Sequence, residues 1–157
     1  MCDYSLMMMD SRLAVAGEQL VAHRFRSGST GLVSLAEFQS WQERPRPGLW
    51  QRCKECFSSR NEPVSVVCIP PGSRLRLDAI PSGLRRQFDL DACEEVTFTQ
   101  ISADANWHRD ALTFPGKAAN VLLQYLPEGQ MVTVLQLSSS GAGDPDPELA
   151  RYAPAHR

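Results

Sequence analysis

The fold class is decided by one stretch, residues 64–77, which reads VSVVCIPPGSRLRL. Its first six residues form an apolar run rich in β-branched side chains, which favours a strand. The Pro70-Pro71-Gly72 segment then turns the chain. Residues 74–77 alternate between arginine and leucine, the two-residue period of a strand with one buried face. Two short strands joined by a tight turn predict a β-rich fold.

Similar patterns recur on both sides of this stretch. Residues 13–15 and 20–25 are expected to form a hairpin around Gly17 and Glu18. Further strands are expected at residues 95–101, 111–114, 121–126 and 131–137. Ser34 and Glu37 have the spacing of a capping box, and Pro45 ends the helix that follows it. Short helices are also expected at residues 49–58 and 81–88.

These elements define a fold that is mainly β with short helices, in the α+β class. Many short strands joined by glycine and proline turns favour a small barrel or sandwich of about 6–8 strands, because closure removes exposed sheet edges. We expect one β-rich globular domain at residues 1–137. Residues 138–157 are rich in serine, glycine and proline and are expected to be a disordered tail.

Charge and targeting features limit the class of protein. The chain has 157 residues and a formal net charge of −2, which argues against a dedicated nucleic-acid binder. No stretch reaches the length of a membrane span, and the N-terminus lacks the features of a signal peptide. We therefore expect a cytoplasmic protein. A basic segment at residues 41–60 and an acidic one at residues 87–110 leave a protein partner possible.

The cysteines and histidines are the most concrete candidate ligands. Five cysteines, an odd number, in a chain without an export signal indicate reduced thiols rather than a disulfide framework. Thiolates and imidazoles bind zinc or copper(I) well. Three of these residues lie on or beside predicted strands or the N-terminal arm: Cys2, His23 and Cys68. Strands that are distant in sequence can lie together in the fold. These three residues form our first predicted metal site.

A second possible ligand pair is Cys53 and Cys56. Their two-residue spacing is that of half a zinc knuckle, although the chain has no second pair of this kind. The same two cysteines fall on the apolar stripe of the predicted helix at residues 49–58, together with Leu49 and Phe57. Core packing is therefore the favoured interpretation of these two thiols.

Two enzyme hypotheses stand beside the binding hypothesis. Removal of Met1 would leave Cys2 with a free α-amino group that can act as its base. In beginning Met-Cys the chain resembles the N-terminal-nucleophile amidotransferases, although their glycine-rich substrate-binding motifs are missing. His108, between Trp107 and Asp110, is a candidate general base. The sequence thus favours a small binding protein, with an enzyme or a protein-interaction module as alternatives.

Overall fold

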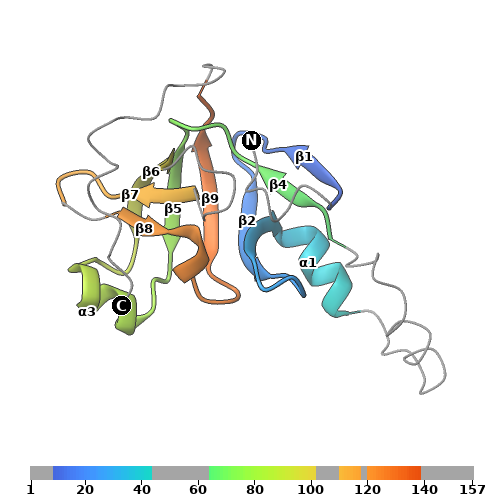
Figure 1. Cartoon of the computed structure of the whole chain (residues 1–157), viewed down its shortest axis with the longest axis horizontal. Coiled ribbons are helices and arrows are strands. Elements are labelled where there is room, and N and C mark those ends of the chain that lie inside the picture. Colours follow the sequence, from blue (N-terminus) through green and yellow to red (C-terminus); the bar gives the residue numbers. More distant parts are fainter. Residues whose placement is uncertain (1–8, 44–63, 102–109, 118–119, 139–157) are drawn as a thin grey trace.

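The computed structural model describes residues 9–43, 64–101, 110–117 and 120–138 (Figure 1). Its elements in chain order are β1 (Ser11–Leu13), β2 (Gln19–Arg24), β3 (Thr30–Ser34), α1 (Leu35–Gln42), β4 (Val66–Cys68), β5 (Arg74–Asp78), α3 (Ser82–Phe88), β6 (Glu94–Gln100), β7 (Asp110–Thr113), β8 (Asn120–Leu122), the 3-10 helix η2 (Leu123–Tyr125) and β9 (Met131–Gln136). None of the helices in these ranges is long and apolar enough to cross a membrane.

The described strands form one mixed sheet of nine strands in the order β1-β4-β3-β2-β9-β5-β6-β7-β8. All neighbours pair antiparallel except β1 and β4, which are parallel. Figure 1 shows the two ends of this order on opposite sides of the molecule. The prediction of a mainly β, α+β protein is therefore confirmed. The sheet is not closed, so a barrel is not confirmed, and nine strands exceed the predicted 6–8.

The curved sheet buries a core on each face. The larger core contains Leu75, Leu77, Val96, Val132 and Val134, because alternate residues of β5, β6 and β9 point inward. A smaller core lies on the opposite face of β2, β3 and β4, where α1 covers it. Its buried members are Val21, Phe25, Val33, Phe38, Val64 and Val66. The two cores give β2 a buried side chain on both faces.

The predicted hairpin at residues 13–25 is wrong. Strand β1 pairs in parallel with β4, with Leu13 opposite Cys68, and not with β2. Both edges of β2 are occupied, one by β3 and the other by β9. A strand pattern identifies the strand, but the choice of partner depends on these distant segments.

The predicted capping box is also wrong, although the helix it preceded is present as α1. Ser34 is the N-cap residue but makes no side-chain capping bond. The carboxylate of Glu37 instead accepts the Ser65 backbone N–H at 3.1 Å and lies 3.7 Å from Arg12 Nε. A tertiary contact thus replaces the local one. The predicted helix at residues 49–58 and residues 139–157 of the predicted tail lie outside the described residues.

Glu18 ties the turn after β1 to the body of the protein. Its carboxylate forms an ion pair with Arg12 and accepts the Val15 backbone N–H at 3.0 Å. The hydrogen bond from Arg12, with the one from Val15, lowers the pKa of Glu18 below its ordinary value of 4.5. A lowered pKa means that the folded state prefers the ionised carboxylate, so this stabilisation is present above pH 4.5 and is lost as the pH falls.

We therefore predict a pH-dependent effect of Glu18→Gln. At pH 7 the variant should lose about 1–2 kcal/mol of unfolding free energy, the range for hydrogen bonds to a charged group that is partly solvated. At pH 3 the difference from the unmodified protein should largely disappear. Urea unfolding at both pH values measures it, with Glu95→Gln as a control because its ion pair with Arg74 is exposed. Equal losses at pH 7 and pH 3 would contradict the assignment.

Candidate functional site

His23 lies on β2 and points into the smaller core. Only 7% of the residue is exposed. The sequence prediction that His23 shares a face with Val21 and Phe25 is confirmed, because both belong to the smaller core. A histidine at such a position needs partners for its two ring nitrogens, because an unsatisfied buried polar atom is destabilising.

One ring nitrogen is held by Glu128. The Nδ1 atom of His23 lies 2.7 Å from Glu128 Oε1, and the Arg24 backbone N–H donates to Glu128 Oε2 at 2.6 Å. A carboxylate has no hydrogen to donate, so Nδ1 carries the hydrogen of this bond. Both oxygens of Glu128 are therefore engaged by consecutive residues of β2, which fixes the carboxylate against the imidazole.

A tight turn brings Glu128 to this place. The Gln130 N–H donates to the Pro127 carbonyl oxygen at 3.1 Å, and Gly129 has a φ of 82°. This is the geometry of a type II turn, whose third residue needs the left-handed region that glycine adopts freely. Two backbone hydrogen bonds of 2.9 Å each hold the turn against β2. The Gly129 N–H donates to the Ala22 carbonyl, and the Ala22 N–H donates to the Gln130 carbonyl.

Three aromatic rings surround the imidazole. The ring centroids of Phe25, Phe38 and Trp41 lie 4.9, 5.6 and 5.5 Å from that of His23, at interplanar angles of 58–74°. Edge and tilted contacts of this kind are favourable for aromatic rings. Together with the bond to Glu128, they fix the orientation of the imidazole ring.

The second ring nitrogen, Nε2, has no hydrogen-bond partner among the described residues. Of their side-chain atoms, only Gln130 Oε1 is both fully buried and without a partner, and Nε2 is not among such atoms. With the hydrogen on Nδ1, Nε2 carries a free lone pair. The arrangement therefore presents one oriented imidazole nitrogen that can bind a metal ion or accept a proton.

Cys68, the second predicted ligand on a described strand, lies on the same face of the sheet as His23. Val66 pairs with Val33, which pairs with Val21, and all three belong to the smaller core. Cys68 is two residues beyond Val66 and shares its face. Strand β3 lies between it and His23. Cys68 is disulfide-bonded, so the expectation of reduced thiols is wrong there, and it can offer a thiolate only after reduction.

The other described cysteine, Cys93, is free and exposed. Its thiol donates to Asp78 Oδ1 at 3.2 Å. This hydrogen bond to a carboxylate raises the pKa of Cys93, because the negative charge disfavours the thiolate. The Cys93 thiol therefore stays protonated at neutral pH.

The remaining candidates lie outside the described residues: Cys2, Cys53, Cys56 and His108. Within the described ranges, no group of three or more histidine, cysteine, aspartate or glutamate side chains can hold a metal ion. Sequence reasoning singled out His23 as a candidate ligand but not Glu128, its hydrogen-bond partner. The segment at residues 127–129 read only as a turn, and no local pattern links it to a histidine 105 positions earlier.

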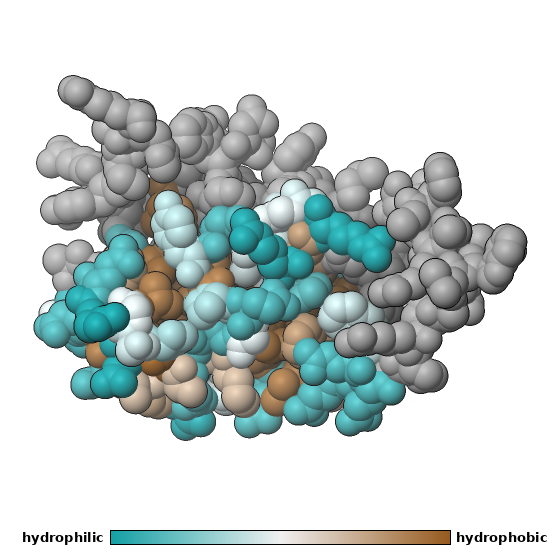
Figure 2. Space-filling model, turned by 90° about the horizontal axis from the view of Figure 1, so that it is seen from below, coloured by the Kyte–Doolittle hydropathy of each residue, from teal (hydrophilic) through white to brown (hydrophobic). Residues whose placement is uncertain are grey.

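Figure 2 views the molecule from the end at which Figure 1 shows the turn before β9, and the apolar residues there form small patches separated by hydrophilic ones.

Comparisons of the chain with protein-family models, with curated proteins and with solved structures give no match. The site's own chemistry is therefore the basis for assigning a function.

Proposed function

We propose that this protein is a small binding protein that holds a soft transition metal, zinc or copper(I), with His23 as its anchoring ligand. The observation that carries the proposal is the hydrogen bond of 2.7 Å between His23 Nδ1 and Glu128. Histidines that bind metals almost always donate their other ring N–H to a carboxylate or carbonyl, which fixes the tautomer and makes the ligating nitrogen more basic.

The environment of His23 supports the same assignment. The aromatic rings restrict the imidazole to one orientation, so little rotamer freedom is lost when Nε2 binds a cation. Zinc and copper(I) prefer imidazole and thiolate ligands, the residue types of the predicted set Cys2, His23 and Cys68. In this proposal Cys2 contributes a thiolate, and Cys68 contributes one when its disulfide is reduced.

Glu128→Gln tests the role of the carboxylate. The amide is nearly isosteric with the carboxylate but uncharged, so the variant should bind zinc or copper(I) about 10–100-fold more weakly, the usual effect of losing such a partner. Affinity is measured by competition with a chromogenic chelator, on protein kept reduced. Circular dichroism on the same samples verifies the fold.

Glu95→Gln is the matched control. Its side chain is 55% exposed, close to the 49% of Glu128, and it pairs with Arg74 away from His23. This variant should bind metal as the unmodified protein does. Equal affinities for Glu128→Gln and the unmodified protein would refute the proposed role of Glu128. Equal losses in both variants would show a general effect of surface charge.

A further inference from the structure

The outer backbone edge of β1 faces no other strand that the structure describes. Among the described strands it is at the end of the sheet and pairs only with β4. On the paired side, Val66 N–H donates to the Asp10 carbonyl at 2.8 Å and Ala14 N–H donates to the Cys68 carbonyl at 2.9 Å. Hydrogen-bonding direction alternates along a strand, so Ser11 and Leu13 direct their N–H and C=O groups outward.

Two large apolar side chains are exposed at the end of β1 and just beyond it. Leu13 is 69% exposed and Val15 is 62% exposed, the highest values among the large hydrophobic residues described. Natural edge strands are usually protected by a charge, a proline or a bulge. The charged residue of β1 is Arg12, and its guanidinium instead forms ion pairs with Glu18 and Glu37 of the same chain. The edge is thus short, and of its outward backbone groups the Leu13 carbonyl accepts a hydrogen bond from Arg12 Nη1 at 3.3 Å.

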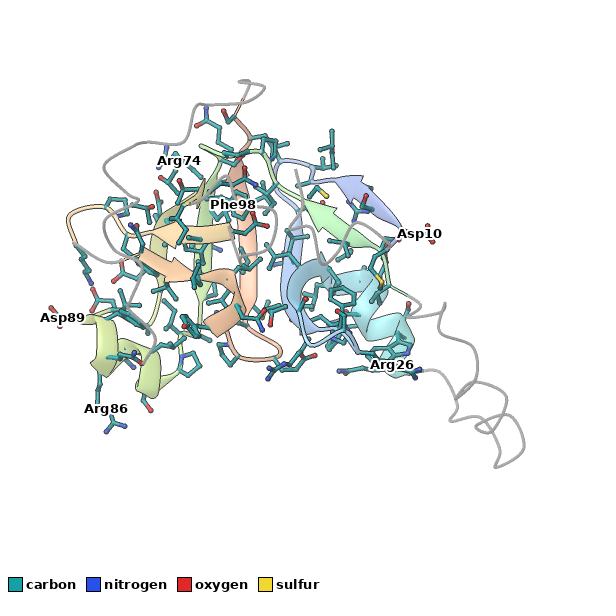
Figure 3. The ribbon with its side chains drawn as sticks, in the orientation of Figure 1. Asp10, Arg26, Arg74, Arg86, Asp89 and Phe98 are labelled. Atoms are coloured by element: carbon teal, nitrogen blue, oxygen red, sulfur yellow. The ribbon has the colours of Figure 1, made fainter. Side chains whose placement is uncertain are left out.

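The charges around β1 are predominantly negative. Among the described residues, Arg12 pairs with two carboxylates, those of Glu18 and Glu37, and Asp10 adds a third negative charge directly before the strand. Figure 3 shows Asp10 projecting beyond the strand, at the outer edge of the molecule. Pairing of β1 with β1 of a second copy would place like charges together and is opposed by repulsion. A segment carrying positive charges is attracted instead.

We propose that the outer edge of β1 binds an extended segment of a partner protein by strand addition. The segment carries apolar side chains at alternate positions, which contact Leu13 and Val15, and lysine or arginine on each side of them. Ser11 offers it a backbone N–H and C=O, and Leu13 offers its N–H, since the Leu13 carbonyl already accepts from Arg12. Because β1 has only three residues, the interface is small and the complex is transient.

A synthetic heptapeptide tests this, with threonine and valine alternating between terminal lysines. Titrated into isotopically labelled full-length protein, it should shift the backbone amide resonances of Ser11 and Leu13. A peptide with terminal glutamates should bind at least about fivefold more weakly, because the edge is acidic. Shifts confined to other parts of the protein, or equal affinities for both peptides, would overturn the proposal.

Two variants examine the edge itself. Leu13→Pro removes an outward N–H and adds a ring, a change that an edge strand tolerates. It should lower the affinity for the lysine peptide by about tenfold or more. Asp10→Lys should weaken it without any change in the backbone. Tyr125→Ala, at an exposed hydrophobic residue of η2, should have no effect. If the amide resonances of Ser11 and Leu13 shifted with protein concentration in the absence of peptide, the edge would bind a second copy of the chain, and the proposal would be refuted.

Discussion

Leu75→Ala is expected to lower the free energy of unfolding by about 2–5 kcal/mol, the range for truncating a fully buried leucine. Leu75 is completely buried in the larger core. It lies on β5 opposite Val96 of β6 and Val134 of β9, so its side chain packs where three central strands meet. The loss combines the transfer of the removed atoms to water with the cavity that remains.

Leu13→Ala is the matched control because the chemical change is identical. Leu13 is 69% exposed, and surface substitutions of this kind usually change stability by less than about 0.5 kcal/mol. Guanidinium unfolding followed by tryptophan fluorescence measures both variants. If the two substitutions lowered the free energy of unfolding by similar amounts, the larger core would not be the main source of the protein's stability.

His23→Gln is expected to abolish stoichiometric metal binding. Glutamine retains an amide that can bond to Glu128, but it supplies no imidazole nitrogen for the metal. Losing the ligand itself should weaken affinity by at least the roughly 10–100-fold that follows loss of its hydrogen-bond partner. Chelator competition under reducing conditions, with zinc and with copper(I), measures the affinity. Unchanged affinity in this variant would remove His23 from the proposed site.

His156→Gln is the control for this substitution. It makes the same chemical change at a histidine that we assign no role. It should bind metal with the affinity of the unmodified protein. Thermal unfolding of both variants separates a lost ligand from a lost fold, because His23 is buried and its replacement also alters the packing of the aromatic rings.

The hydrophobic pattern of the sequence predicted helices and strands well where the element buries one face. Leucines alternate with arginines in β5, and Leu35, Phe38 and Trp41 recur at helical spacing in α1. Alternation also placed His23 on the apolar face of β2. In each case the periodicity of the backbone and the burial of one face impose the pattern.

The features that failed depend on contacts between distant segments. Strand β1 satisfies the pattern of a hairpin strand, yet it pairs with β4, more than fifty positions later. Glu37 fits a capping box, yet Ser65 and Arg12 take its carboxylate. The partner of His23 comes from the turn before β9. Tertiary contacts of this kind leave no local trace in a single sequence.

The central claim is that the protein holds a transition metal through His23. Elemental analysis of protein purified without chelators or affinity metals, and kept reduced, tests it most directly. We predict about one zinc or copper per chain, the stoichiometry of a single site with three or four protein ligands. Metal content at background in folded, reduced protein, with no uptake after incubation with zinc or copper(I), would contradict the claim.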